Sequence, residues 1–394
     1  MLRIIPTMLV ALFVAITRAE DVKPLKIGSA APDFNLPGID GKQHTLSEYS
    51  KANVLVIAWL SNHCPDSQAS EGRVKKLVED MKGKSFALVA INPNNPEGLR
   101  PDELGYSKYN DSLEEMKLHA KEQGFNFPYL YDGDTQAAAH AYGCLATPHI
   151  FVFDKDRKLR YQGRLDESRF ADEATVTSPD ARNAIEAVLA GKEVTVTETK
   201  VHGCSTKWLS KKDGVAKDDE KWEKGAVEVE PIDAKGVAAL RKNDTNKVRM
   251  FNVWATWCGP CVKEFPELVR TSRKFGLRDF EFISISMDDP KTIAEVKEFL
   301  EKKNAIVPDK LKASLAKEGR KGNAYVFSES NSDALIAALD PQWEGPIPHT
   351  LVVAPGGKVI YRHNGQVDGD ELRGKILDYM GRFYVPETAA TGKQ

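Results

Sequence analysis

Runs of apolar residues alternate along this chain with stretches in which apolar positions recur every three or four residues. The runs predict buried strands, and the periodic stretches predict amphipathic helices. The clearest strand signals are residues 54–60 (VLVIAWL), 86–91 (FALVAI), 248–254 (VRMFNVW) and 280–286 (FEFISIS). Helical patterns occur at 112–123, 181–190, 293–302 and 371–383. Strands that alternate with helices predict an α/β fold, in which helices flank a central mixed β-sheet.

The same order of signals occurs twice. In each half an apolar strand that ends in tryptophan leads into a cysteine and a helical pattern, and an X-Pro-His step, at 147–149 and at 347–349, precedes a later strand. The chain has 394 residues, of which 41% are hydrophobic, enough for two cores. We therefore expect a divergent duplication with domains at 28–208 and 226–387.

A charged segment separates the two halves. Residues 210–225 (SKKDGVAKDDEKWEKG) contain ten charged positions among sixteen, and Trp222 is the only large apolar side chain. This composition predicts a solvated linker at 209–225. Residues 388–394 are expected to form a frayed tail.

The first nineteen residues predict export. Arg3 precedes an apolar run, and Thr17-Arg18-Ala19 fits a cleavage site, so residues 1–19 are interpreted as a signal peptide. The run is too short to span a bilayer, so no stable membrane insertion is expected after its removal. Removal changes the formal charge from -2 to -4, because it takes away two arginines and no acid. The charge and the absence of a basic patch argue against nucleic acid as a partner.

The second half carries a Cys-x-x-Cys motif between a predicted strand and a predicted helix. In WATWCGPCVKEFP, Cys258 is placed at the start of the helix, where free N–H groups and the helix dipole favour a thiolate. Cys261 follows one turn later and could displace a substrate that Cys258 has captured. The spacing therefore predicts a redox-active dithiol.

A Cys-x-x-Cys motif also occurs in three other kinds of site. A zinc site would need two further ligands with partner spacing, which the second half lacks, so no metal is expected. Haem attachment would need histidine after Cys261, where Val262 stands. A static disulfide would not require the placement between strand and helix, although the sequence alone leaves it open. No cofactor is expected.

With Ile347-Pro348, this motif resembles the TlpA/ResA branch of thioredoxin-like proteins over residues 226–385. The resemblance implies a thioredoxin fold and a cis peptide bond before Pro348, which would lie against the dithiol and shape a substrate surface with Trp257. It also implies that Glu264 relays the proton of Cys261. Residues 309–345 depart from the family, and we expect them to form an insertion near the site.

The first half resembles peroxiredoxin-like redoxins of the AhpC/TSA superfamily over residues 28–208, through APDFNLPGIDGK, Asn62-His63-Cys64-Pro65, FPYL and GCSTKW. The whole chain would thus hold two tandem thioredoxin-like domains. Cys64 is the expected nucleophile, since a helix start and His63 would both lower its pKa, whereas Asp66 would raise it.

Cys64 lacks a local second cysteine, because Ser67 stands at that position. Cys144 and Cys204 are candidates to resolve it, although Cys144 fits a small buried apolar residue equally well. Peroxidases of this superfamily carry an arginine where alignment puts Pro148, and a proline where this chain has Ile57. Pro148 is instead a candidate for substrate contact.

These observations predict an exported, periplasmic or otherwise extracytoplasmic, thiol-disulfide oxidoreductase that reduces protein disulfides through Cys258 and Cys261, with Cys64 as a redox partner. The TlpA/ResA resemblance implies a membrane thiol-reductant relay as electron donor. Two alternatives stay open. One is a thiol peroxidase that uses Cys64 and is reduced by the second domain, and the other is a redox-inert first domain that binds clients.

Overall fold

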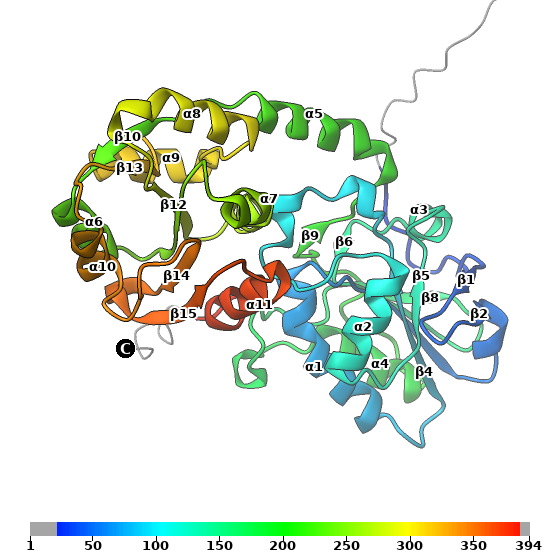
Figure 1. Cartoon of the computed structure of the whole chain (residues 1–394). Helices are drawn as coiled ribbons and strands as arrows, with labels where there is room; N and C mark the ends of the chain where they lie inside the picture. Colours follow the sequence, from blue (N-terminus) through cyan, green and yellow to red (C-terminus); the bar gives the residue numbers. More distant parts are fainter. Residues whose placement is uncertain (1–21, 387–394) are drawn as a thin grey trace, which may run out of the picture.

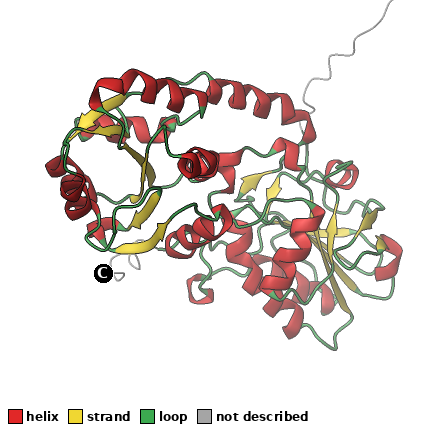
Figure 2. Cartoon of the chain, in the orientation of Figure 1, coloured by secondary structure: helices red, strands yellow, loops and turns green. Residues whose placement is uncertain are grey.

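The computed structural model describes residues 22–386 and contains one large β-sheet in each half of the chain. Figure 1 shows the two sheets in separate parts of the molecule, and Figure 2 shows helices packed around both. The predicted signal peptide and tail lie outside the described residues. Among the helices that are described, none combines the length and the apolar character that crossing a bilayer requires.

The first half forms a mixed five-stranded sheet in the order β5-β4-β3-β7-β8, and β6 and β9 form a separate pair. β3 is parallel to β4 and antiparallel to β7. The strands are β1 Asn35–Pro37, β2 Gln43–Thr45, β3 Val54–Trp59, β4 Phe86–Asn92, β5 Tyr129–Tyr131, β6 Ala146–Thr147, β7 His149–Phe153, β8 Leu159–Gly163 and β9 Cys204–Ser205. The helices are α1 Pro65–Asp80, α2 Leu113–Gln123, α3 Ala137–Tyr142 and α4 Asp180–Leu189.

The second half forms a mixed six-stranded sheet in the order β10-β13-β12-β11-β14-β15. The strands are β10 Val229–Ile232, β11 Val248–Trp254, β12 Phe280–Ser286, β13 Ala324–Phe327, β14 His349–Val353 and β15 Val359–Asn364. The helices are α6 Ala234–Lys242, α7 Gly259–Lys274, α8 Ile293–Lys302, α9 Asp309–Lys317, α10 Ser332–Leu339 and α11 Gly369–Met380. The expected fold class, two tandem thioredoxin-like α/β units, is confirmed.

Alternating side chains of the central strands enter two cores. Val54 and Val56 of β3 pack into the cluster on one face of the first sheet, whereas Leu55 and Ile57 pack into the cluster on the other. Successive side chains of a strand point to opposite faces, so a strand covered on both sides is apolar throughout. This burial explains why the sequence pattern located β3, β4, β11 and β12 closely.

The segment 309–345 differs from the expected insertion. β13 is an internal strand of the sheet, parallel to both β10 and β12. It has a counterpart in the first half, because β5 is likewise parallel to β4 and is followed by α3, as β13 is followed by α10. The segment is therefore mainly part of the duplicated scaffold, and only its end approaches the dithiol.

The charged segment between the halves is a helix, α5 (Lys212–Glu223), where the sequence predicts a solvated linker. It runs from the first half toward the second (Figure 1). No residue of α5 is fully buried, but Trp222 packs against the second core and donates from Nε1 to the carbonyl of Asn304 at 3.1 Å. The Arg273 guanidinium of α7 lies 5.3 Å from the Trp222 ring centroid and pairs with Asp218. These contacts order the helix.

A polar and aromatic interface joins the two halves. Arg278 donates to the carbonyl of Gly105 at 2.7 Å, and its guanidinium lies 3.8 Å from the ring centroid of Tyr106. Tyr106 packs in turn on Tyr384, with the ring centroids 5.3 Å apart. Gly105 also lies close to the carbonyl of Lys274, the last residue of α7. The halves therefore meet at the C-terminal end of α7.

Candidate active sites

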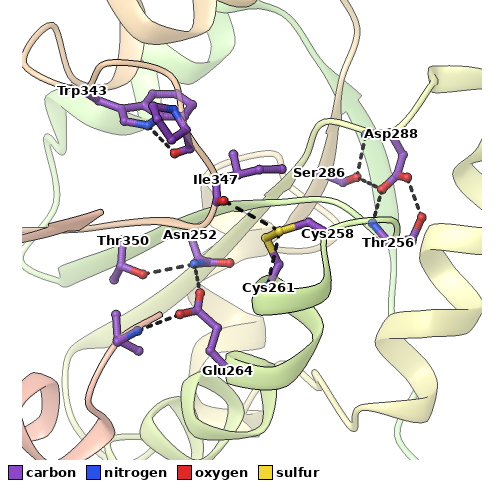
Figure 3. Close-up of a disulfide and its surroundings, with 12 residues drawn as sticks. Asn252, Thr256, Cys258, Cys261, Glu264, Ser286, Asp288, Trp343, Ile347 and Thr350 are labelled. Carbon is purple, nitrogen blue, oxygen red and sulfur yellow. Dashed lines mark hydrogen bonds between the residues drawn. A yellow bond between two sulfur atoms is a disulfide. The ribbon is translucent and has the colours of Figure 1, made fainter. Parts of the chain in front are cut away.

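The dithiol of the second half lies at the start of α7, where the sequence placed it. Cys258 is the N-cap residue, and its Sγ accepts a hydrogen bond from the backbone N–H of Cys261 at 3.3 Å. Cys258 and Cys261 are joined as a disulfide (Figure 3). The backbone carbonyl of Ile347, which precedes the cis peptide bond to Pro348, lies 3.8 Å from the sulfur of Cys258. The expected cis-proline is confirmed beside the dithiol.

The two sulfurs differ in their access to solvent. Cys258 is 7% exposed and is surrounded in sequence by exposed residues, namely Trp257, at 69%, with Gly259 and Pro260. Cys261 is fully buried. A substrate that approaches this surface therefore meets Cys258 first, and Trp257 offers it an apolar contact.

A hydrogen-bond network holds the loop that presents Cys258. The carboxylate of Asp288, after β12, accepts from the backbone N–H of Thr256 at 2.9 Å and from its hydroxyl at 2.6 Å. The Ser286 hydroxyl donates to the same carboxylate at 2.5 Å. The loop between β11 and α7 is thus anchored to the neighbouring parallel strand (Figure 3).

Glu264 lies one turn beyond Cys261 on α7 and is fully buried. Its carboxylate accepts hydrogen bonds from Asn252 Nδ2 at 2.9 Å and from the backbone N–H of Val367 at 2.8 Å. Burial raises the pKa of Glu264 to about 7, although both hydrogen bonds act in the opposite direction. Within the described part of the chain no cation pairs with this carboxylate. Figure 3 shows it below the disulfide.

The end of the segment 309–345 borders the dithiol surface. Trp343 stacks on the His349 ring at a centroid distance of 4.8 Å and donates from Nε1 to the carbonyl of Pro346 at 2.7 Å. Pro346 directly precedes Ile347, whose carbonyl faces Cys258. Trp343 therefore supports the backbone that lies against the disulfide, as Figure 3 shows.

Cys64 of the first half occupies the equivalent position at the start of α1. It is the N-cap residue, and its Sγ donates to the carbonyl of Thr147 at 3.0 Å. The Thr147–Pro148 peptide bond is cis, as the corresponding bond is in the second half. Unlike Cys258, Cys64 is completely buried, and so are Pro65 and Asp66 after it.

A buried ion pair lies beside Cys64. His63 Nδ1 and a carboxylate oxygen of Asp111 are 2.5 Å apart, and both side chains are buried. Burial lowers the pKa of His63, but the charge of Asp111 and their hydrogen bond outweigh it and raise this pKa. Burial likewise favours the neutral form of Asp111, yet His63 holds the pKa of Asp111 below its usual value. The sequence analysis missed Asp111, because 48 positions separate the pair and no local pattern connects them.

The pKa of Cys64 is lowered. Burial alone would raise this pKa, but a hydrogen bond from the Cys204 side chain and the charge of His63 outweigh the effect of burial. The predicted opposition from Asp66 is present, and the backbone N–H of Ser67 contributes a further lowering. A thiolate at this position is therefore favoured by its neighbours.

The arginines around Cys64 are engaged with carboxylates. Arg169 forms two hydrogen bonds to Asp66, at 2.6 and 2.8 Å. Arg73 pairs with Asp166, with Nε 2.7 Å from a carboxylate oxygen. The ring of Tyr384, from the second half, lies 4.8 Å from the Arg169 guanidinium and covers this side of the site.

The two candidate resolving cysteines have different surroundings. Cys144 is buried in the core beside β3, where its Sγ donates to the carbonyl of Ala146 at 3.5 Å. Burial raises the pKa of Cys144 far above its usual value. Cys204, on β9, donates from its backbone N–H to Cys64 Sγ at 3.3 Å. The structure therefore brings Cys204, and not Cys144, to Cys64.

The dithiol lies at the end of α7 that is remote from the Arg278–Gly105 contact. The halves meet at the C-terminal end of α7, whereas Cys258 precedes its first residue. At 1.5 Å per residue the sixteen residues of α7 place the dithiol about 24 Å from that contact.

Comparisons with known proteins match the two halves of the chain to two families. Residues 27–162 match the AhpC/TSA family, and residues 236–376 match the Redoxin family. The chain is 25% identical over 134 residues to the thiol-disulfide oxidoreductase ResA of Geobacillus thermodenitrificans, which is 34% of this chain and 67% of the relative. It spans 62% of the length of the ResA of Bacillus subtilis, at 26% identity over 35% of this chain.

Two further similarities concern the peroxiredoxins and the solved structures. The chain is 28% identical over 78 residues to the peroxiredoxin Bcp of Escherichia coli, which is 20% of this chain and 50% of that protein. A hypothetical protein of Sinorhizobium meliloti with a crystal structure has 36% sequence identity and a TM-score of 0.43, over 48% of this chain and 97% of its own. The chain is a tandem thioredoxin-fold oxidoreductase, with an AhpC/TSA-type first half and a redoxin-type second half similar to the ResA proteins.

Proposed function

We propose that this protein reduces protein disulfides through Cys258 and Cys261. One observation carries the proposal: the sulfur of Cys258 lies at a helix start on an open surface, with Cys261 bonded to it from the buried side. In the dithiol state the Cys258 thiolate attacks a client disulfide, and one client sulfur leaves as a thiol. Cys261 then attacks Cys258, the second client thiol leaves, and the Cys258–Cys261 disulfide forms.

Glu264 is proposed to accept the proton of Cys261 during the second step. The two residues lie three positions apart on α7 and share a helix face. A carboxyl with a pKa of about 7 can take up and return a proton at neutral pH. Because Glu264 is a proton acceptor for a reacting sulfur, its loss should slow the release of the client more than its capture.

Client binding is assigned to Trp257 and to the backbone before Pro348, with Pro148 as the corresponding position of the first half. The clients are protein disulfides, as the similarity to ResA suggests. The Gly-Pro spacer is that of strongly reducing thioredoxins, with potentials of about -270 mV, which supports a role as a reductant. We propose domains at 28–208 and 226–387, export to the periplasm or another extracytoplasmic space, and a membrane thiol-reductant relay as electron donor.

Cys64 is proposed to be a second redox thiol. Its lowered pKa and its position at the start of α1 support this role over that of a redox-inert client-binding domain. Disulfide exchange is favoured over peroxidase chemistry, because Arg169, which lies close enough to Cys64 to sense its charge, is paired with Asp66. Electron transfer from Cys258 to Cys64 is proposed to need either a rearrangement of the halves or a second molecule, because the dithiol lies at the end of α7 remote from the Arg278–Gly105 contact.

The test is disulfide reduction by the full chain, with insulin as substrate and dithiothreitol as electron source. The Cys258→Ser variant should lose the activity, and Cys261→Ser should accumulate a covalent insulin adduct on Cys258. Cys144→Ala is the matched control and should retain full activity, because Cys144 lies in the core of the other half. Full activity in Cys258→Ser would refute the proposal, and peroxide consumption that depends on Cys64 would favour the peroxidase alternative.

A further inference from the structure

The cis-proline surfaces of the two halves are occupied differently. In the second half no strand pairs with residues 346–347 anywhere in the described range, so the backbone beside Cys258 is open. In the first half the corresponding backbone, at Thr147, is paired with β9 in an antiparallel register that sets Thr147 opposite Cys204. The chain thus supplies its own extended segment where the second half leaves an open edge. Such an edge can accept another chain by backbone pairing.

This segment places Cys204 directly against Cys64. The backbone N–H of Cys204 donates to Cys64 Sγ at 3.3 Å, and Cys64 Sγ in turn donates to the carbonyl of Thr147, the residue paired with Cys204. Neighbouring contacts fix the segment on both sides, because the Thr206 hydroxyl donates to the carbonyl of Cys144 at 2.9 Å. The backbone of Gly203 approaches the cis-proline so closely that a Cβ there would collide with the Thr147 carbonyl oxygen.

We propose that Cys64 and Cys204 form a second redox couple, in which the segment 203–206 acts as a tethered substrate strand and Cys204 resolves Cys64. The inference extends the proposed redox role of Cys64 and is independent of Cys258. The first half can then reduce one client disulfide without the second half, although no second cysteine lies near Cys64 in the sequence. The substrate class is a disulfide that reaches Cys64 when β9 lifts, and β9 contributes only two residues to its pairing.

The electrons balance within this couple. The Cys64 thiolate attacks one sulfur of the client disulfide, the S–S bond breaks, and the other client sulfur leaves and takes up a proton. Cys204 then attacks Cys64 Sγ in the mixed disulfide, and the second client sulfur leaves with the proton that Cys204 gives up. The client gains two electrons, and the Cys64–Cys204 disulfide forms. A dithiol donor returns the couple to its reduced state.

The assignment of roles follows from the electrostatics. The backbone N–H of Cys204 donates to Cys64 Sγ, and the closeness of the two thiols lowers the pKa of Cys64 and raises the pKa of Cys204. Cys64 is therefore the thiol that is ionised first, and Cys204 keeps its proton until the charge on Cys64 has been consumed. This order makes Cys64 the attacking sulfur and Cys204 the resolving one.

The experiment uses the full chain with Cys258→Ser and Cys261→Ser, so that its outcome does not depend on the first proposal. The reduced protein is mixed with oxidised glutathione, quenched with acid at intervals and mapped by mass spectrometry. We expect a transient glutathione adduct on Cys64, followed by a peptide in which Cys64 and Cys204 are linked. Adding Cys204→Ser should leave the glutathione on Cys64. Adding Cys144→Ala should change nothing.

Gly203→Ala gives a test that retains both thiols. The added methyl group must displace β9 from the Thr147 carbonyl, so resolution of the adduct should slow by at least about tenfold. Gly191→Ala is the matched control, since Gly191 also has a positive φ, of 67°, but has open space around it. A Cys64–Cys144 link, an unreactive Cys64, adduct loss in Cys204→Ser, or equal rates in the two glycine variants would overturn the proposal.

Discussion

The protonation of Glu264 provides a quantitative test of how its site is built. The folded chain holds this carboxyl at a pKa of about 7, against an ordinary value of 4.5, because burial disfavours the charged form. Each pH unit between the two values corresponds to about 1.4 kcal/mol, so ionising Glu264 costs the folded state about 3 kcal/mol. Glu264→Gln removes this cost and retains an amide of similar size.

The direction of the pH dependence of stability follows from the number of protons that the folded and unfolded states bind. Between about pH 4.5 and pH 7 the folded state holds more protons at this position than the unfolded state, so stability falls as the pH rises. The loss is complete above pH 7 and absent below 4.5. We therefore expect Glu264→Gln to gain about 3 kcal/mol in unfolding free energy relative to the wild type over this range.

The measurement is urea unfolding of the oxidised protein, wild type and variant, from about pH 4.5 to about pH 8. The glutamine amide cannot accept hydrogen bonds from both Val367 and Asn252 as a carboxylate does. This loss lowers the unfolding free energy of the variant by about 1 kcal/mol at every pH. Glu295→Gln, at an exposed position of α8, is the control for the same change of side-chain chemistry outside the core. If the difference in unfolding free energy between Glu264→Gln and the wild type did not vary with pH, burial would not be raising the pKa of Glu264.

Three further results are expected. Asp111→Asn should make alkylation of Cys64 near neutral pH about tenfold slower in competition assays. Loss of the buried acid leaves His63 neutral, and this raises the pKa of the Cys64 thiol by about one unit. An unchanged alkylation rate would contradict this reasoning. Trp257→Ala should raise KM for a protein disulfide severalfold with little change in kcat, because this exposed ring lies beside Cys258. A lower kcat at constant KM would argue against a binding role for Trp257. Arg278→Ala should lower unfolding free energy by about 2 kcal/mol and loosen the two halves in solution scattering, because its guanidinium donates to the Gly105 carbonyl across the interface and to the Met380 and Gly381 carbonyls of its own half. Scattering identical to the wild type would show that other contacts hold the halves together.

The two halves illustrate how one scaffold can expose or cover a reactive sulfur. Cys258 and Cys64 both cap a helix that follows a central strand, and both lie beside a cis-proline. The difference arises from segments outside the shared scaffold, since β9 covers Cys64 and no strand of the described chain pairs with the equivalent edge near Cys258. The exchange of clients is therefore expected to be fast at Cys258 and gated at Cys64.

Local sequence determined the central strands, several of the helices and the two sulfurs at helix starts. The apolar runs in 54–60 and 248–254 indicate burial on both faces of a strand, and a cysteine that follows such a strand reaches the helix start within a few residues. These features depend on neighbours in the chain, so a pattern of residue types is sufficient to locate them.

Only the tertiary structure decided which distant groups meet. Asp111 reaches His63 across 48 positions, and Cys204 reaches Cys64 across 140, because separate loops return to the same end of the sheet. Residues 212–223 of the charged segment form a helix that is ordered by contacts of Trp222 and Asp218 with the second half. Such contacts depend on how whole elements pack, and the free energy that selects them is shared among residues that no local pattern connects.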